Sequence, residues 1–262
     1  ILCHSEKAAA YMADGYARAC RRPGVALAQS VGAANLAAGL QDPWLARSPV
    51  VAITGRNPHA LRYRGAYQEI NHWPMYEPVT KFNAYVDDAA SLPAILRQAF
   101  REATTGAPAP VHLDLLGIYG EGVAEAVADL EPAAEPQFGS YPAFRPQPPA
   151  EAIREAARLL AGAKRPAMLA GGGAAASGAG EEVVALAEHL CMPVATTLDG
   201  KGLIPETHRL SAGVAGTYSR PCANRALCEA DLVLMAGCGA GGQATHFWRV
   251  PPAGTRVIQI DI

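Results

Sequence analysis

The chain opens with ILCHSEKAAAYMADGYARACRRPGVALAQSVGAANLAAGL (residues 1–40), and this stretch is the most informative for the fold. An extended apolar start gives way to an alanine-rich run that favours helix, and Ser5 is a suitable N-cap for that helix. Glu6 therefore lies at a strand-to-helix corner, where a carboxylate can meet a ligand. An acidic residue in a first helical turn is also common because it complements the helix dipole. Glu6 is thus a candidate catalytic residue that needs support from the rest of the chain.

A second candidate region follows directly. The sequence predicts a strand at 25–29, a loop of small residues at 30–35 and a helix at 36–44. In that geometry, backbone N–H groups at the start of the helix face a ligand. A loop of small residues can equally well serve close packing alone, so both interpretations stand.

The rest of the chain alternates predicted helices with mostly apolar strands, which is typical of parallel sheets covered on both faces. A polar segment at 56–78 shows no periodicity, and segments of that length in a compact domain are usually functional. The other predicted elements are strands at 48–55, 81–86, 111–116, 167–170, 193–197, 231–236 and 255–261, and helices at 92–104, 150–161, 180–190 and 223–229. We predict an α/β fold with two doubly wound, mostly parallel sheet domains, the second of them Rossmann-like.

Prolines divide the chain. They recur between residues 132 and 149 with little hydrophobic periodicity, so we predict domains at 1–118 and 150–262 joined by a proline-rich linker at 119–149. The chain starts without methionine, and both of its ends read as strands. Because domains normally end in solvent, we expect it to be part of a longer polypeptide.

The composition excludes several classes of function. The 262 residues carry a formal net charge of −2 with acidic and basic residues mixed throughout, so we expect neither nucleic acid nor a membrane as a partner. No apolar run reaches the roughly 20 residues that span a bilayer. The six cysteines form no C-x-x-C pair and the histidines show no ligand spacing. We therefore expect no metal site or disulfide framework in this chain, and a cytoplasmic location.

A glycine-rich turn in the second part raises an alternative. Gly171, Gly173 and Ala176 satisfy the loose G-x-G-x-x-A pattern of dinucleotide-binding turns after a strand. Three glycines followed by three alanines can also match by composition alone. Asp199 only approximates the acidic residue expected after the next strand. An NAD-dependent dehydrogenase is accordingly the less favoured interpretation.

Several segments, in this order, resemble one family. In the first part they are HSEKAAAYMADGYAR (4–18), PGV leading to GAANL (23–36), PVVAITG (49–55), and AYQE followed by PVTK (66–81). In the second part they are LAGGG (169–173), PVATTLDGKGLIPE (193–206) and VIQID (257–261). Together they are similar to the pyrimidine-binding and central domains of thiamine-diphosphate-dependent enzymes of the acetolactate synthase type.

The resemblance implies specific roles. Glu6 matches the family's catalytic glutamate, which exchanges a proton with a ring nitrogen of the cofactor's aminopyrimidine. Gly32, Asn35 and Gln68 match residues that border the cofactor. A 2-keto acid or related carbonyl compound is the implied substrate, and a homodimer or tetramer, formed through the pyrimidine-binding domain, the implied assembly. The family's first strand and helix would precede this chain, and its diphosphate-binding domain, which holds Mg²⁺, would follow.

Three departures from the family pattern stand out. Ser5 separates His4 from the glutamate, and VGAAN (31–35) replaces the family's GPGATN. The motif RFDDR, typical of members that bind FAD, is GAGGQ (239–243) here, so the resemblance gives no support for FAD. A non-catalytic nucleotide- or CoA-binding module of the same fold remains an alternative.

Overall fold

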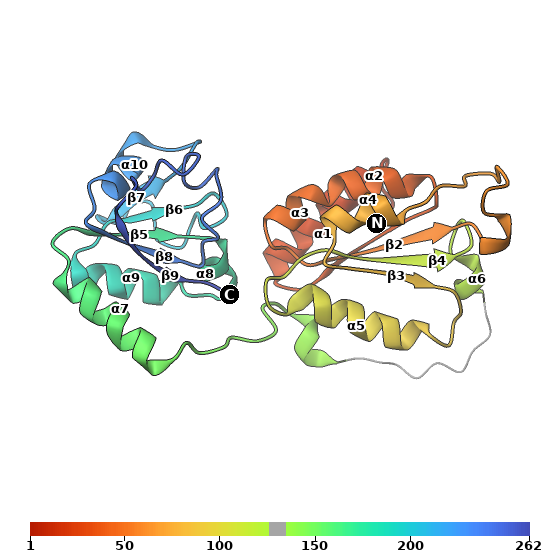
Figure 1. Ribbon diagram of the computed structural model, residues 1–262, viewed down its shortest axis with the longest axis horizontal. Helices are drawn as coiled ribbons and strands as arrows, with labels where there is room; N and C mark the ends of the chain where they lie inside the picture. Colours follow the sequence, from red (N-terminus) through yellow and green to blue (C-terminus); the bar gives the residue numbers. More distant parts are fainter. Residues whose placement is uncertain (126–134) are drawn as a thin grey trace. The chain divides into compact units, whose positions relative to one another are not determined.

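The computed structural model describes residues 1–125 and 135–262, which form two compact units, 1–144 and 145–262. Each unit is built around its own parallel sheet with helices on both faces (Figure 1). The α/β class with two doubly wound, mostly parallel sheets is thereby confirmed. Part of the predicted linker at 119–149 lies outside the described residues.

The sheet of the first unit has four parallel strands in the order β1-β2-β4-β3. Its strands are β1 (Gly24–Ala28), β2 (Val50–Arg56), β3 (Phe82–Val86) and β4 (Val111–Leu116). Because side chains alternate along a strand, Val50 and Ala52 of β2 enter one apolar core, while Val51 enters the core on the other face. The first unit therefore has an apolar core on each face of its sheet.

Helices from different parts of the chain cover those faces. On one face lie α1 (Glu6–Cys20), α2 (Gly32–Gly39), α3 (Gln41–Leu45) and α4 (Trp73–Tyr76), and on the other lies α5 (Leu92–Thr104) (Figure 1). A short helix, α6 (Glu121–Ala124), follows β4. Alanines dominate the buried side of α1, so this helix approaches the sheet closely.

The second unit has five parallel strands in the order β7-β6-β5-β8-β9. They are β5 (Pro166–Ala170), β6 (Val194–Thr196), β7 (Ser211–Val214), β8 (Leu232–Ala236) and β9 (Arg256–Ile260). Numbered from β5, this is the order 3-2-1-4-5 of a Rossmann sheet.

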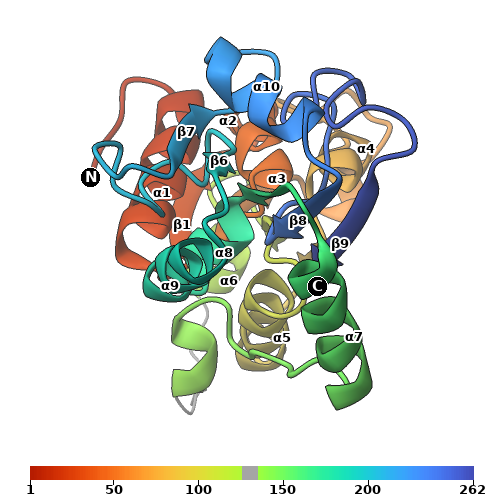
Figure 2. The same cartoon turned by 90° about the vertical axis from the view of Figure 1, so that its left-hand side faces the viewer.

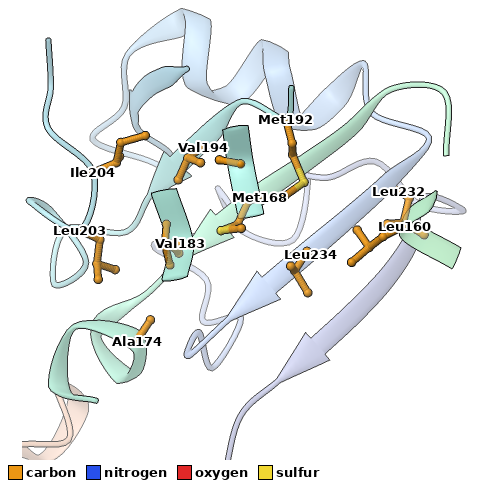
Figure 3. Packing of buried hydrophobic residues seen from close by; sticks show 12 residues of the cluster. Leu160, Met168, Ala174, Val183, Met192, Val194, Leu203, Ile204, Leu232 and Leu234 are labelled. Atoms are coloured by element: carbon orange, nitrogen blue, oxygen red, sulfur yellow. The ribbon is translucent and has the colours of Figure 1, made fainter. Parts of the chain in front are cut away.

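Two layers of helices enclose that sheet. The helices α7 (Ala150–Gly162) and α9 (Gly180–Leu190) lie on one face, and α10 (Pro221–Cys228) on the other (Figure 2). Figure 3 shows the core beneath α7 and α9, where Met168 and Leu234 of neighbouring strands and Val183 of α9 belong to one apolar cluster. A short helix, α8 (Gly172–Ala176), follows β5.

The structure corrects four sequence-based predictions. Residues 1–3 are irregular, and Ile1 and Leu2 are exposed. The second helix begins at Gly32, inside the predicted loop, because the Ala33 N–H already bonds to the Gln29 carbonyl. The predicted glycine loop at 171–173 opens the helix α8 instead. Strand β7 was not predicted, since its alanine and glycine carry little strand propensity.

Candidate active site

The candidate catalytic carboxylate and the candidate amide are in direct contact. Asn35 of α2 donates a side-chain hydrogen bond to Oε2 of Glu6, at 3.2 Å. Glu6 begins α1, whose first turn is fixed by the Ser5 hydroxyl accepting from the Ala8 N–H at 3.2 Å. Glu6 is half-buried and Asn35 is exposed, so the carboxylate lies at a surface that a ligand can reach.

Gly32 lies beneath the same carboxylate. A Cβ at residue 32 would come within 2.6 Å of Oε1 of Glu6 and 2.8 Å of its Cδ. Such distances are far below van der Waals contact, so a side chain at residue 32 would displace the glutamate. The sequence-predicted residues Glu6, Gly32 and Asn35 therefore form one site at the junction of α1 and α2.

Gln68 joins this site through the loop before α2. The buried Ser30 hydroxyl donates to the Gln68 backbone carbonyl at 2.9 Å, two residues before Gly32. Gln68 has a left-handed backbone, with φ of 57°. Its side-chain Oε1 is buried and has no hydrogen-bond partner among the described residues. A buried acceptor without a partner is costly, and a ligand with an N–H group would satisfy it.

A buried polar network that includes His72, at the start of α4, was not predicted. His72 Nδ1 lies 3.1 Å from Oδ2 of Asp114, and the Thr54 hydroxyl donates to Oδ1 of Asp114 at 2.8 Å. All three side chains are buried. Nε2 of His72 is also buried and lacks a hydrogen-bond partner among the described residues. The network joins the carboxyl ends of β2 and β4 to the start of α4.

His112 extends this network toward α2. Its Nε2 lies 2.7 Å from the Thr54 hydroxyl, and its ring stacks on Tyr76 with centroids 3.5 Å apart. Burial lowers the pKa of His112 to about 3, outweighing the attraction of Asp114, so the ring is neutral. The Tyr76 hydroxyl donates to the Ala33 carbonyl in the first turn of α2.

A sequence signal for this network existed in β4. His112 and Asp114 are two residues apart on an otherwise apolar strand, and alternate strand residues share a face. Two polar residues on one face of a buried strand predict a hydrogen-bonded partner for each. His4, in contrast, is exposed and separate from this network.

The glycine turn after β5 serves the packing of the second unit. The N–H groups of Gly171 and Gly173 donate to the carbonyls of Ala236 and Gly237, at 2.8 and 2.9 Å. A Cβ at residue 171 would lie 2.2 Å from the Gly237 oxygen. Those two N–H groups are therefore occupied by the neighbouring strand end, which argues against a dinucleotide pyrophosphate there.

Within the described residues, the helices are too short or too polar for a membrane span.

Two family models match the chain in sequence order. The N-terminal TPP binding domain of thiamine pyrophosphate enzymes matches residues 1–75, and the central domain of the same enzymes matches residues 153–262. The first match contains Glu6, Gly32, Asn35 and Gln68.

Relatives from distant organisms align with the whole chain. A probable acetolactate synthase large subunit of Methanocaldococcus jannaschii is 39% identical over 265 residues, which cover all of this chain and 44% of that protein. The acetolactate synthase isozyme 1 large subunit of Escherichia coli is 33% identical, with 45% of its length covered. The chloroplastic acetolactate synthase 1 of Zea mays is 35% identical, with 40% covered. The chain thus spans less than half the length of these relatives. The two domain matches, together with relatives that align from end to end of this sequence, show that the chain belongs to the thiamine pyrophosphate enzyme family.

Proposed function

We propose that the chain supplies the pyrimidine-binding and central domains of an acetolactate synthase-like enzyme that depends on thiamine diphosphate and Mg²⁺. Its substrate would be a 2-keto acid or a related carbonyl compound, and its reaction decarboxylation with formation or cleavage of a C–C bond. The observation that carries this proposal is the contact of Glu6 with Asn35 above Gly32. The names of the aligned relatives support the same class of reaction.

We propose a division into two domains and a linker, which the family matches at residues 1–75 and 153–262 support. Residues 1–118 would form the pyrimidine-binding domain, 119–149 the linker, and 150–262 the central domain. We further propose a homodimer or tetramer formed through the first of these domains, in the cytoplasm. The six free cysteines are compatible with a reducing compartment.

The residues present fit the aminopyrimidine of the cofactor. Asn35 occupies Oε2 of Glu6, whereas Oε1 has no hydrogen-bond partner among the described residues. A heteroaromatic ring nitrogen can share a proton with that oxygen. The buried Oε1 of Gln68 is an unused acceptor for an amino group. Glu6, Gly32, Asn35 and Gln68 would accordingly hold the pyrimidine.

Each residue has a distinct task in the proposed mechanism. When bound, thiamine diphosphate supplies the carbon nucleophile and the electron sink for decarboxylation. Glu6 would hold a proton at Oε1 and exchange it with the ring nitrogen. Asn35 would fix the orientation of that carboxylate through Oε2, and Gly32 would leave room for it.

Calorimetry and one substitution test the proposal. We expect the full-length enzyme, freed of cofactor, to bind thiamine diphosphate in the presence of Mg²⁺, and Glu6→Gln to lower turnover by roughly 10²-fold. Glu77→Gln is a suitable control because Glu77 is exposed and makes no hydrogen bond through its carboxylate within the described part of the chain. Unchanged turnover in Glu6→Gln would remove the proposed role of Glu6. Binding of nucleotides or CoA without thiamine diphosphate would support a non-catalytic module instead, and NAD-linked turnover a dehydrogenase.

A further inference from the structure

Gln68 is held in a backbone conformation that a residue with a side chain rarely adopts. Its φ of 57° is left-handed, which crowds Cβ against the backbone. The segment before it offers little apolar packing, since Tyr63 and Tyr67 are 93% and 75% exposed. Hydrogen bonds, rather than a hydrophobic core, must therefore keep Gln68 in place.

The carboxylate of the neighbouring residue, Glu69, accepts two hydrogen bonds in this segment. Glu69 accepts from the backbone N–H of Tyr63 through one oxygen, and from the N–H of Ala66 through the other, at 3.0 Å. The pKa of Glu69 is lowered chiefly by the Tyr63 N–H, against a smaller opposing effect of burial, with further help from Ala66, Arg64 and Gly65. Residues 63–66 thus turn around the carboxylate and point successive N–H groups at it, as in an anion-binding nest.

Two further contacts fix the backbone that follows this turn. The Asn57 side chain donates to the Tyr67 carbonyl at 2.9 Å, and Ser30 donates to the Gln68 carbonyl. Both hold the backbone next to Gln68, but neither closes the turn at 63–66. The Glu69 carboxylate connects both ends of that turn to the residue that follows Gln68, whereas the bond from the Glu69 N–H to the Ala66 carbonyl, at 3.0 Å, reaches its last residue alone.

We propose that Glu69 is a positioning residue for Gln68. By gathering the N–H groups of residues 63–66, its carboxylate holds the Gln68 backbone left-handed and directs the Gln68 amide toward the pyrimidine. Both Glu69 oxygens are used by the backbone, so Glu69 acts through its neighbour and not on the cofactor itself. This inference rests on the proposed function, in which Gln68 contacts thiamine diphosphate.

A double-mutant cycle measures the coupling of the two residues. Calorimetry with thiamine diphosphate and Mg²⁺ gives the Kd for the full-length enzyme freed of cofactor, as wild type, Gln68→Ala, Glu69→Ala and the double variant. We expect each single change to weaken binding roughly tenfold, as loss of one hydrogen bond does, and the double variant to be no weaker than Gln68→Ala. Multiplying effects in the double variant, or an unchanged Kd in Glu69→Ala, would refute the proposal. Glu69→Gln replaces Glu69→Ala if the latter does not fold, because it keeps the side-chain volume and loses the charge.

Trypsin provides a readout that does not require the cofactor. Arg62, directly before the turn at 63–66, and Arg64, inside it, are exposed cleavage sites. In the apoprotein we expect Glu69→Ala and Glu69→Gln to be cut there roughly tenfold faster than wild type, since local opening becomes easier. Glu77→Ala should be cut at the wild-type rate. Equal rates for all four proteins would overturn the proposed hold on the loop.

The two experiments separate this inference from the proposed function. If the wild-type protein fails to bind thiamine diphosphate, the proposed function is wrong. If the protein binds the cofactor normally but neither Glu69 variant changes the Kd or the tryptic rate, only the role of Glu69 is wrong.

Discussion

The carboxylate of Glu6 lies directly against the Cα of Gly32, where a methyl group would come within 2.6 Å of Oε1. At this point of contact between α1 and α2, the space beside the Glu6 carboxylate holds the hydrogen of a glycine but not a methyl group. The contact places an acidic group and the start of α2 at the same point of the surface. It also makes the site sensitive to the smallest possible substitution.

Gly32→Ala is therefore expected to displace Glu6 and to weaken thiamine diphosphate binding by about tenfold or more. Gly15→Ala is the matched control, since Gly15 lies in α1 with no neighbouring atom within 4 Å of the added Cβ. That control should leave binding unchanged and raise the free energy of unfolding by about 0.5–1 kcal/mol. Calorimetry and thermal unfolding measure both. Equal cofactor affinities in the two variants would contradict the proposed position of Glu6.

Asn35→Ala removes the donor that orients the Glu6 carboxylate. Loss of a hydrogen bond to a charged group costs about 1.5–3 kcal/mol. The cost is smaller here because Asn35 is exposed, so that water can replace its amide. We expect a decrease of roughly tenfold in kcat with little change in the free energy of unfolding. Steady-state kinetics beside denaturant unfolding would distinguish this result from general destabilisation, which would lower both.

The buried network predicts acid sensitivity of the first unit. The folded state keeps His112 neutral down to about pH 3, whereas the unfolded chain binds a proton near pH 6.5. The unfolded state therefore holds more protons between these values, and stability is lost as the pH falls from about 6.5 to 3, by up to about 1.4 kcal/mol per pH unit. His112→Gln should reduce the slope of stability against pH in this range by about one proton. Denaturant titrations at several pH values test this, and an unchanged slope would show that His112 is protonated in the folded state.

Asp114→Ala should be far more damaging than its size suggests. It leaves the Thr54 hydroxyl and the His72 N–H buried without their acceptor. We expect a loss of about 3 kcal/mol or more in the free energy of unfolding. Asp88→Ala, at an exposed turn, is the control and should cost about 1 kcal/mol or less. A small effect of Asp114→Ala would mean that water replaces the carboxylate in the network.

Much of the fold could be predicted from local pattern. The helix at 92–104 and the strand at 111–116 have the predicted bounds, because each combines strong periodicity with clear boundary residues. Strand β7 could not be predicted, since Ser211 and Gly213 carry no strand signal and pair only because β6 lies beside them. The start of α2 was placed too late because small residues suggested a loop.

The site was predictable only in part. No local pattern shows that Glu6 and Asn35, 29 residues apart, share a hydrogen bond, and only the family resemblance placed them together. The resemblance also indicated Gln68, but not the carboxylate beside it that holds the turn. A left-handed backbone is usually signalled by glycine. Because residue 68 is glutamine, its left-handed conformation could not be predicted from the sequence.

The stacking of Tyr76 on His112 restricts which substitutions either residue can accept. The tyrosine ring covers the imidazole while its hydroxyl reaches α2, so neither aromatic group has an independent environment. An aliphatic residue in place of His112 would remove one of the two hydrogen-bond partners of the Thr54 hydroxyl and the ring on which Tyr76 stacks. We expect related sequences in which residue 112 is not histidine to differ at residue 76 as well, so that the two positions change together.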